Sequence, residues 1–158
     1  MKKLDIKAMK DKQQGSFVLE ALIAILLFAI GILAIIGLQS VSIRNTAGAK
    51  YRTDASLLAN QIIGQMWIAD KTNATLVANF CGPAGTGTCT AAGTTLYPAW
   101  ATTVANALPG VTAPGVTPVA NAPTISIDAN NVATVTVYWQ APNDKSSHLY
   151  STSARIND

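Results

Sequence analysis

The 158-residue sequence predicts an α+β protein in which a long N-terminal helix packs on a small antiparallel β-sheet. Three observations predict this class. An apolar run at residues 17–38 carries a single charge, and an amphipathic, proline-free stretch continues it to Asp70. From Thr124 onward, short segments of alternating polarity are separated by turn residues, as in antiparallel strands.

The apolar run is long enough to cross a membrane. It contains 22 residues, of which only Glu20 is charged. At about 1.5 Å of rise per residue, a helix of this length crosses a hydrocarbon layer of roughly 30 Å. Residues 1–15 carry five lysines against two aspartates. This excess predicts a single pass with a cytoplasmic N-terminus and a C-terminal part beyond a bacterial inner membrane.

A secretory signal peptide is the first alternative. Its apolar core normally has about 7–15 residues and ends at a small-residue cleavage site. The run here is longer, and residues 37–40 match such a site poorly. We therefore favour a retained membrane span.

The amphipathic continuation predicts that the same helix extends beyond the membrane. Leu58, Ile62 and Met66 recur at intervals of four residues and form one apolar stripe. No proline interrupts residues 17–70, which predicts one helix of about 54 residues that ends near residues 70–73. Its second half would pack against a small head.

The two cysteines of the chain, Cys81 and Cys89, close a glycine-rich loop. The predicted topology places this loop in an oxidising compartment, where two nearby cysteines usually pair. We expect a structural disulfide. Metal binding needs more ligands than these cysteines and the single histidine, His148, provide, so we expect neither a metal site nor a cofactor.

The spacing and composition of residues 97–156 predict the remaining helix, connection and strands. Trp100, Val104 and Leu108 lie four residues apart and predict a short helix with Pro98 in its first turn. Residues 111–123 are rich in proline and small residues and predict an irregular connection. Residues 124–127, 132–140 and 148–156 predict three strands, the second with Val135, Val137 and Trp139 on one face.

Gly15, Ser16 and Glu20, with the lysine-rich segment before them and the apolar run after them, resemble the cleavage motif of type IV prepilins. That family includes the pseudopilins of type II secretion. The resemblance implies that a prepilin peptidase cuts after Gly15 and that Ser16 becomes the methylated N-terminus. It also implies that Glu20, the fifth mature residue, pairs with the N-terminal amine of a neighbouring subunit. The alternative is an ordinary signal anchor in which an acidic residue lies near the membrane interface without a role in assembly.

The same resemblance divides the chain into three parts. Residues 1–15 would be a removable leader and residues 16–39 the transmembrane and assembly half of the helix. Residues 40–158 would be a periplasmic head that includes the second half of the helix. Ser16 departs from the phenylalanine that is commoner at this position in the family, and Phe17 follows it.

Within the prepilin family the chain is most similar to minor pilins of the PilV group. The segments that carry this similarity are residues 20–24, 31–33, 37–39, 57–62, Met66, Trp100, residues 108–110 and 137–140, and His148. The similarity implies a subunit that primes pilus assembly with other minor pilins and the major pilin, with the fibre tip as one location. A minor pseudopilin of a type II secretion system is the alternative within the family.

A tip pilin that binds DNA or a surface is an alternative of a different class. Nucleic-acid binding requires clustered lysine and arginine, and these residues are sparse outside the leader. We also do not expect an enzyme. His148 is the single histidine, the acidic residues are scattered, and neither a nucleophile elbow nor a phosphate-binding loop is present in the sequence. No catalytic residue is therefore assigned.

Overall fold

The computed structural model describes residues 14–87, 89–116, 120–142 and 144–157. Most of the predicted leader, residues 1–13, lies outside this part of the chain. The chain divides into two compact units, with the division between Thr46 and Ala47. Helix α1, Gln14–Ile68, is 55 residues long. The predicted single helix is thus confirmed, and it ends two residues before Asp70.

The first unit consists, in its described residues, of the N-terminal part of α1. Large apolar side chains between Phe17 and Leu38 are exposed by 43% to 73%. The most apolar window of α1 has no buried residue, and among the described residues α1 is the one helix long and apolar enough to cross a membrane. In water this much apolar surface is unfavourable, so this half of the helix requires a lipid or protein environment.

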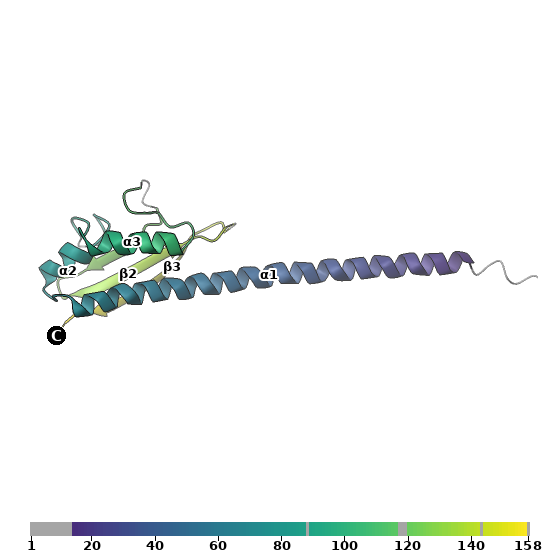
Figure 1. The fold of residues 1–158 in the computed structure, drawn as a ribbon, viewed down its shortest axis with the longest axis horizontal. Helices are drawn as coiled ribbons and strands as arrows, with labels where there is room; N and C mark the ends of the chain where they lie inside the picture. Colours follow the sequence, from purple (N-terminus) through teal and green to yellow (C-terminus); the bar gives the residue numbers. More distant parts are fainter. Residues whose placement is uncertain (1–13, 88, 117–119, 143, 158) are drawn as a thin grey trace, which may run out of the picture. The chain divides into compact units, whose positions relative to one another are not determined.

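The second unit contains a three-stranded antiparallel sheet in the order β1-β2-β3 (Figure 1). The strands are β1, Thr124–Ile127, β2, Val132–Trp139, and β3, His148–Arg155. All three strands were predicted, and β2 and β3 each end one residue earlier than expected. Burial alternates along β2, with Val135, Val137 and Trp139 on the buried face as predicted.

Helices cover that buried face. The second half of α1 contributes six buried residues to the core: Ala55, Leu58, Ala59, Ile62, Ile63 and Met66. Helix α3, Leu96–Ala107, adds Tyr97, Trp100 and Val104. The indole Nε1 of Trp100 donates a hydrogen bond of 2.9 Å to the Leu58 carbonyl oxygen of α1. This bond fastens α3 to α1 without leaving the buried indole nitrogen unpaired.

Helix α2, Asn73–Phe80, was not predicted. It is eight residues long and buries only Leu76 and Phe80 against the core. Two apolar residues four apart are a weak periodic signal, and isolated helices this short are marginal in water. Contact with the core therefore stabilises α2, and this contact is not visible in the local sequence.

The predicted disulfide joins Cys81 and Cys89, whose Cα atoms are 5.6 Å apart. Both residues are buried, with at most 1% exposed. Next to the disulfide, the Gly82 N–H donates to the Ile125 oxygen at 2.9 Å, and the Ile125 N–H donates to the Gly82 oxygen at 2.7 Å. The disulfide loop thus pairs with the outer edge of β1 and covers it.

Candidate functional site

The predicted processing and assembly residues lie at the start of α1. Ser16 and Glu20 are separated by one helical turn, so their side chains lie on the same side of the helix, and both are exposed. Gly15 is within the helix as well. Among the described residues, no hydrogen bond or ion pair involves the Glu20 carboxylate.

The surroundings of Glu20 make an unpaired carboxylate unfavourable. The neighbouring side chains Phe17, Val18, Leu19 and Ile23 are apolar and exposed. An acid at the centre of a bilayer costs roughly 2.5–3.5 kcal/mol on insertion scales, and less near an interface. A cationic partner on another molecule would offset this cost, because an ion pair replaces the lost hydration.

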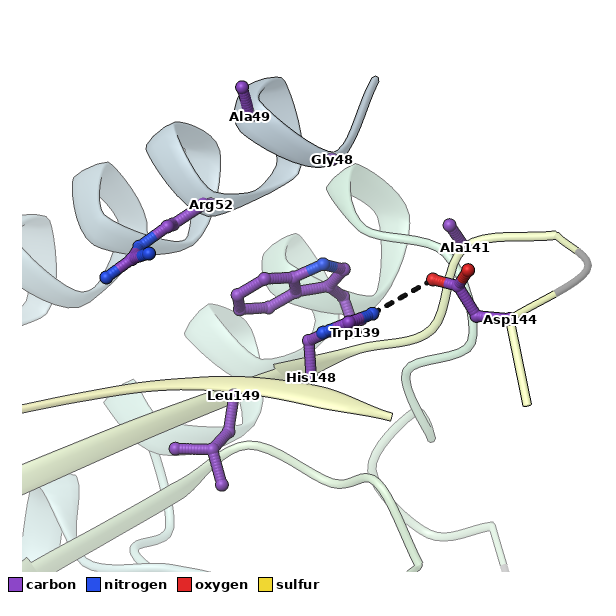
Figure 2. Close-up of a pocket in the computed structure, with 8 residues that line it drawn as sticks. All are labelled: Gly48, Ala49, Arg52, Trp139, Ala141, Asp144, His148 and Leu149. Carbon is purple, nitrogen blue, oxygen red and sulfur yellow. Dashed lines mark hydrogen bonds and ion pairs between the residues drawn. The ribbon is translucent and has the colours of Figure 1, made fainter. Parts of the chain in front are cut away.

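A second candidate feature is an open hollow of about 510 Å³ in the second unit (Figure 2). Eight residues from α1, from β2 and β3 and from their connection line it: Gly48, Ala49, Arg52, Trp139, Ala141, Asp144, His148 and Leu149. Gly48 and Ala49 of α1, which carry no long side chains, line the helix side of the hollow. The Leu149 side chain points away from the indole of Trp139.

The best-defined polar contact of the hollow joins Asp144 and His148. The His148 Nε2 lies 3.0 Å from the Asp144 Oδ2, and the imidazole stacks on the Trp139 indole at a centroid distance of 5.7 Å. His148 is thus an exposed residue at the start of β3. The contact ties the loop that follows β2 to the first residue of β3.

The contact between His148 and Asp144 holds the segment that follows β2 close to the start of β3. The residues that line the hollow include no serine, cysteine or lysine that the His148–Asp144 pair could activate. Within the described residues, no group of three His, Cys, Asp or Glu side chains is placed to hold a metal ion.

Sequence reasoning did not find the hollow, although Trp139 and His148 were both singled out. Their contact follows from the β2–β3 register, in which Trp139 lies opposite His148. The alternation of each strand predicts its faces, but it does not predict which residues of two strands meet. Arg52 approaches the hollow only because α1 packs on the sheet.

An apolar N-terminal helix, continued by a helical segment that packs on a small antiparallel sheet, forms the framework of this protein, and a disulfide closes a loop beside the sheet. The architecture is pilin-like. Comparisons with protein-family models, with curated proteins and with solved structures found no match for this chain. The architecture and the motif residues therefore carry the functional argument.

Proposed function

We propose that this protein is a minor pilin that primes assembly of a type IV pilus together with other minor pilins and the major pilin. The observation that carries the proposal is the start of α1. The exposed apolar run of this helix follows Gly15 and Ser16 and carries one acid at Glu20, and the helix continues into the core of a disulfide-bonded head. The fibre tip is the proposed location.

In this proposal the apolar half of α1 is surrounded first by membrane lipid and then, in the fibre, by other subunits. In the inner membrane, lipid covers the exposed side chains of residues 17–38. In a fibre, apolar helices of neighbouring subunits would replace the lipid at little cost, since both environments exclude water. All residues of the hydrophobic core belong to the second unit, which supports the proposal that the head stays outside the membrane in both states.

Processing supplies a positively charged partner for Glu20. Removal of residues 1–15 by a prepilin peptidase leaves an amine on Ser16, which then becomes methylated. The amine of one subunit pairs with the Glu20 carboxylate of its neighbour and so sets the position of the incoming helix. The role of this protein is therefore structural rather than enzymatic, and its partners are the peptidase, the inner membrane and other pilins.

The test is to delete the gene, restore it and count surface pili in each strain. Loss of pili together with accumulation of the major pilin in the membrane supports priming. If pili persist and protein export fails, the chain is a pseudopilin of a secretion system. If pili persist and adhesion or DNA uptake fails, a binding function at the tip replaces priming.

Mass spectrometry of the chain from cells with an active prepilin peptidase provides a second test. The expected product lacks residues 1–15 and carries one methyl group on Ser16. The same cells without the peptidase are the control and should yield the intact chain. An intact leader in peptidase-positive cells, or a cut after residue 38, contradicts the proposal.

A further inference from the structure

The sheet has one covered edge and one open edge. The edge of β1 is paired with the disulfide loop through Gly82 and Ile125. Among the described residues, no backbone hydrogen bond is made to the outer side of β3. We propose that this open edge receives an extended strand from another subunit, which adds a fourth strand to the sheet. The inference rests on the proposed function, since it requires assembly with other subunits.

The backbone groups that point outward can be identified from the ladder. The Ile156 N–H donates to the Asn131 oxygen at 2.8 Å, next to the pair of Val132 and Arg155. In an antiparallel pair, residues alternate between facing the partner strand and facing away from it. The residues of β3 that direct their N–H and C=O groups outward are therefore Leu149, Ser151, Ser153 and Arg155.

The β1–β2 pair gives the same assignment independently. The Asp128 N–H donates to the Val132 oxygen at 3.1 Å, which places the backbone of Val132 toward β1. Alternation then directs the backbones of Ala133 and Val135 toward β3, where they meet Ala154 and Thr152. The even-numbered residues of β3 are thus used by the sheet, and the odd-numbered residues are available.

Most of the usual protective devices are absent from this edge, which carries one permanently charged side chain, Arg155, at its end. Proteins commonly block open edges with proline, lysine, a bulge or a very short strand. β3 contains no proline and no lysine, and its register with β2 is continuous over eight residue pairs. A strand that lies against it would replace water on a complete row of donors and acceptors, as in other cases of strand addition.

The orientation of β3 argues against antiparallel pairing with the β3 strand of a second copy of this chain. β3 starts at His148, beside Gly48 in the hollow, and ends near Asn131, whose Nδ2 donates to the Lys71 oxygen at 2.9 Å. β3 therefore runs in the same direction as the second half of α1. Antiparallel pairing of two β3 strands would set the second-unit segments of the two α1 helices in opposite directions, whereas the heads of subunits in one fibre are proposed to share one direction.

The exposed side chains define the chemistry of the occupant. On the outer face, Leu149 lies at one end of the edge and is 59% exposed, and Arg155 lies at the other end and is also exposed. Among the described residues, the Arg155 guanidinium has no ion pair. The strand that fits is a segment of a different subunit with an apolar residue opposite Leu149 and an acid opposite Arg155.

A proline substitution tests the backbone contact directly. Ser153→Pro removes an outward N–H at an edge position, where proline is tolerated, whereas Ser153→Ala changes the side chain and keeps the N–H. We expect Ser153→Pro to reduce the number of pili at least tenfold and Ser153→Ala to leave it unchanged. Thermal unfolding of the full chain in detergent shows whether both variants fold. If Ser153→Pro does not fold, Arg155→Glu, which retains the backbone, must reduce pili instead.

Photo-crosslinking identifies the occupant. A benzophenone amino acid is placed at Leu149 and, separately, at Ser153 in cells that assemble fibres, and the same group at Asn60, on an exposed part of α1, is the control. Strand addition predicts crosslinks from positions 149 and 153 to residues about four apart in one extended segment of another subunit. Crosslinks to a second copy of this chain, or without a consistent register, overturn the proposal.

The two proposals can fail separately. If deletion of the gene abolishes pili but Ser153→Pro and Arg155→Glu assemble as the wild type does, the open edge is not a docking site and the priming function stands. If deletion leaves pili intact, the priming function fails whatever the variants do.

Discussion

The aromatic ring of Tyr97 lies directly against the backbone of Gly82, so that a β-carbon built on Gly82 would be 2.5 Å from the ring Cδ1. The Tyr97 hydroxyl donates a hydrogen bond of 2.9 Å to the Pro123 oxygen, at the entrance to β1. The first turn of α3 thus holds the disulfide loop in place beside β1. This contact preserves the pairing that covers one edge of the sheet.

We expect Gly82→Ala to destabilise the head by about 1–3 kcal/mol, because the added methyl group must displace a packed aromatic ring. Gly64→Ala is the matched control, since a β-carbon at Gly64 meets nothing within 4 Å. It should stabilise α1 by up to about 1 kcal/mol. Urea unfolding of both variants in detergent measures the difference, and equal stabilities would contradict the Tyr97 contact.

Asn131, directly before β2, forms hydrogen bonds with Lys71, with Asn73 at the start of α2 and with Ile156 directly after β3. Its backbone angle φ is 57°. Its Nδ2 donates to the Lys71 oxygen, and its Oδ1 accepts a hydrogen bond of 2.8 Å from the Asn73 Nδ2. We expect Asn131→Ala to be less stable than Asn131→Gly by about 1–2 kcal/mol, since glycine tolerates this left-handed conformation. The same unfolding assay compares the two variants. If Asn131→Gly is as unstable as Asn131→Ala, the loss of the side-chain hydrogen bonds alone accounts for the destabilisation, and the backbone conformation does not contribute.

Stability should fall at alkaline pH because of Tyr97. Burial raises the pKa of Tyr97 to about 12, whereas the tyrosine of an unfolded chain has a pKa of about 10. The neutral phenol therefore stabilises the fold below pH 10, and this contribution is lost as the pH rises from about 10 toward 12. Tyr97→Phe should lose this step in a plot of stability against pH. Tyr138→Phe is the control and should retain it.

The Tyr97→Phe variant should also be less stable at neutral pH. It removes the donor to the Pro123 oxygen, and a typical intramolecular hydrogen bond contributes about 0.5–1.5 kcal/mol. Thermal unfolding at neutral pH provides this measurement. An unchanged midpoint would mean that water replaces the phenol at the carbonyl.

Glu20→Val should be processed normally but should incorporate poorly into fibres. The substitution leaves the junction of Gly15 and Ser16 unchanged and removes the carboxylate proposed to pair with a neighbouring amine. Glu20→Asp is the control, because it retains the charge and should recover part of the incorporation. The measurement compares this chain in sheared fibres and in membranes. Normal recovery of Glu20→Val in fibres would eliminate the pairing role.

The sequence alone determined the features that depend on neighbouring residues along the chain. The length of α1 followed from an apolar run and a helical stripe without proline, and the faces of β2 followed from alternation. The disulfide of Cys81 and Cys89 was predictable because both cysteines close one short loop. Each of these signals is local, since helix and strand periods are fixed by backbone geometry.

Only the tertiary structure decided which distant segments meet. Helix α2 exists because Leu76 and Phe80 reach the core, and the edge of β1 is covered because Gly82 pairs with Ile125. The same pairing leaves β3 as the open edge, with Ser153 among its outward residues. Strand order and register depend on packing of the whole head, and no local pattern encodes them. The motif at Gly15 and Glu20 could be read from sequence, but the edge proposed to receive a partner could not.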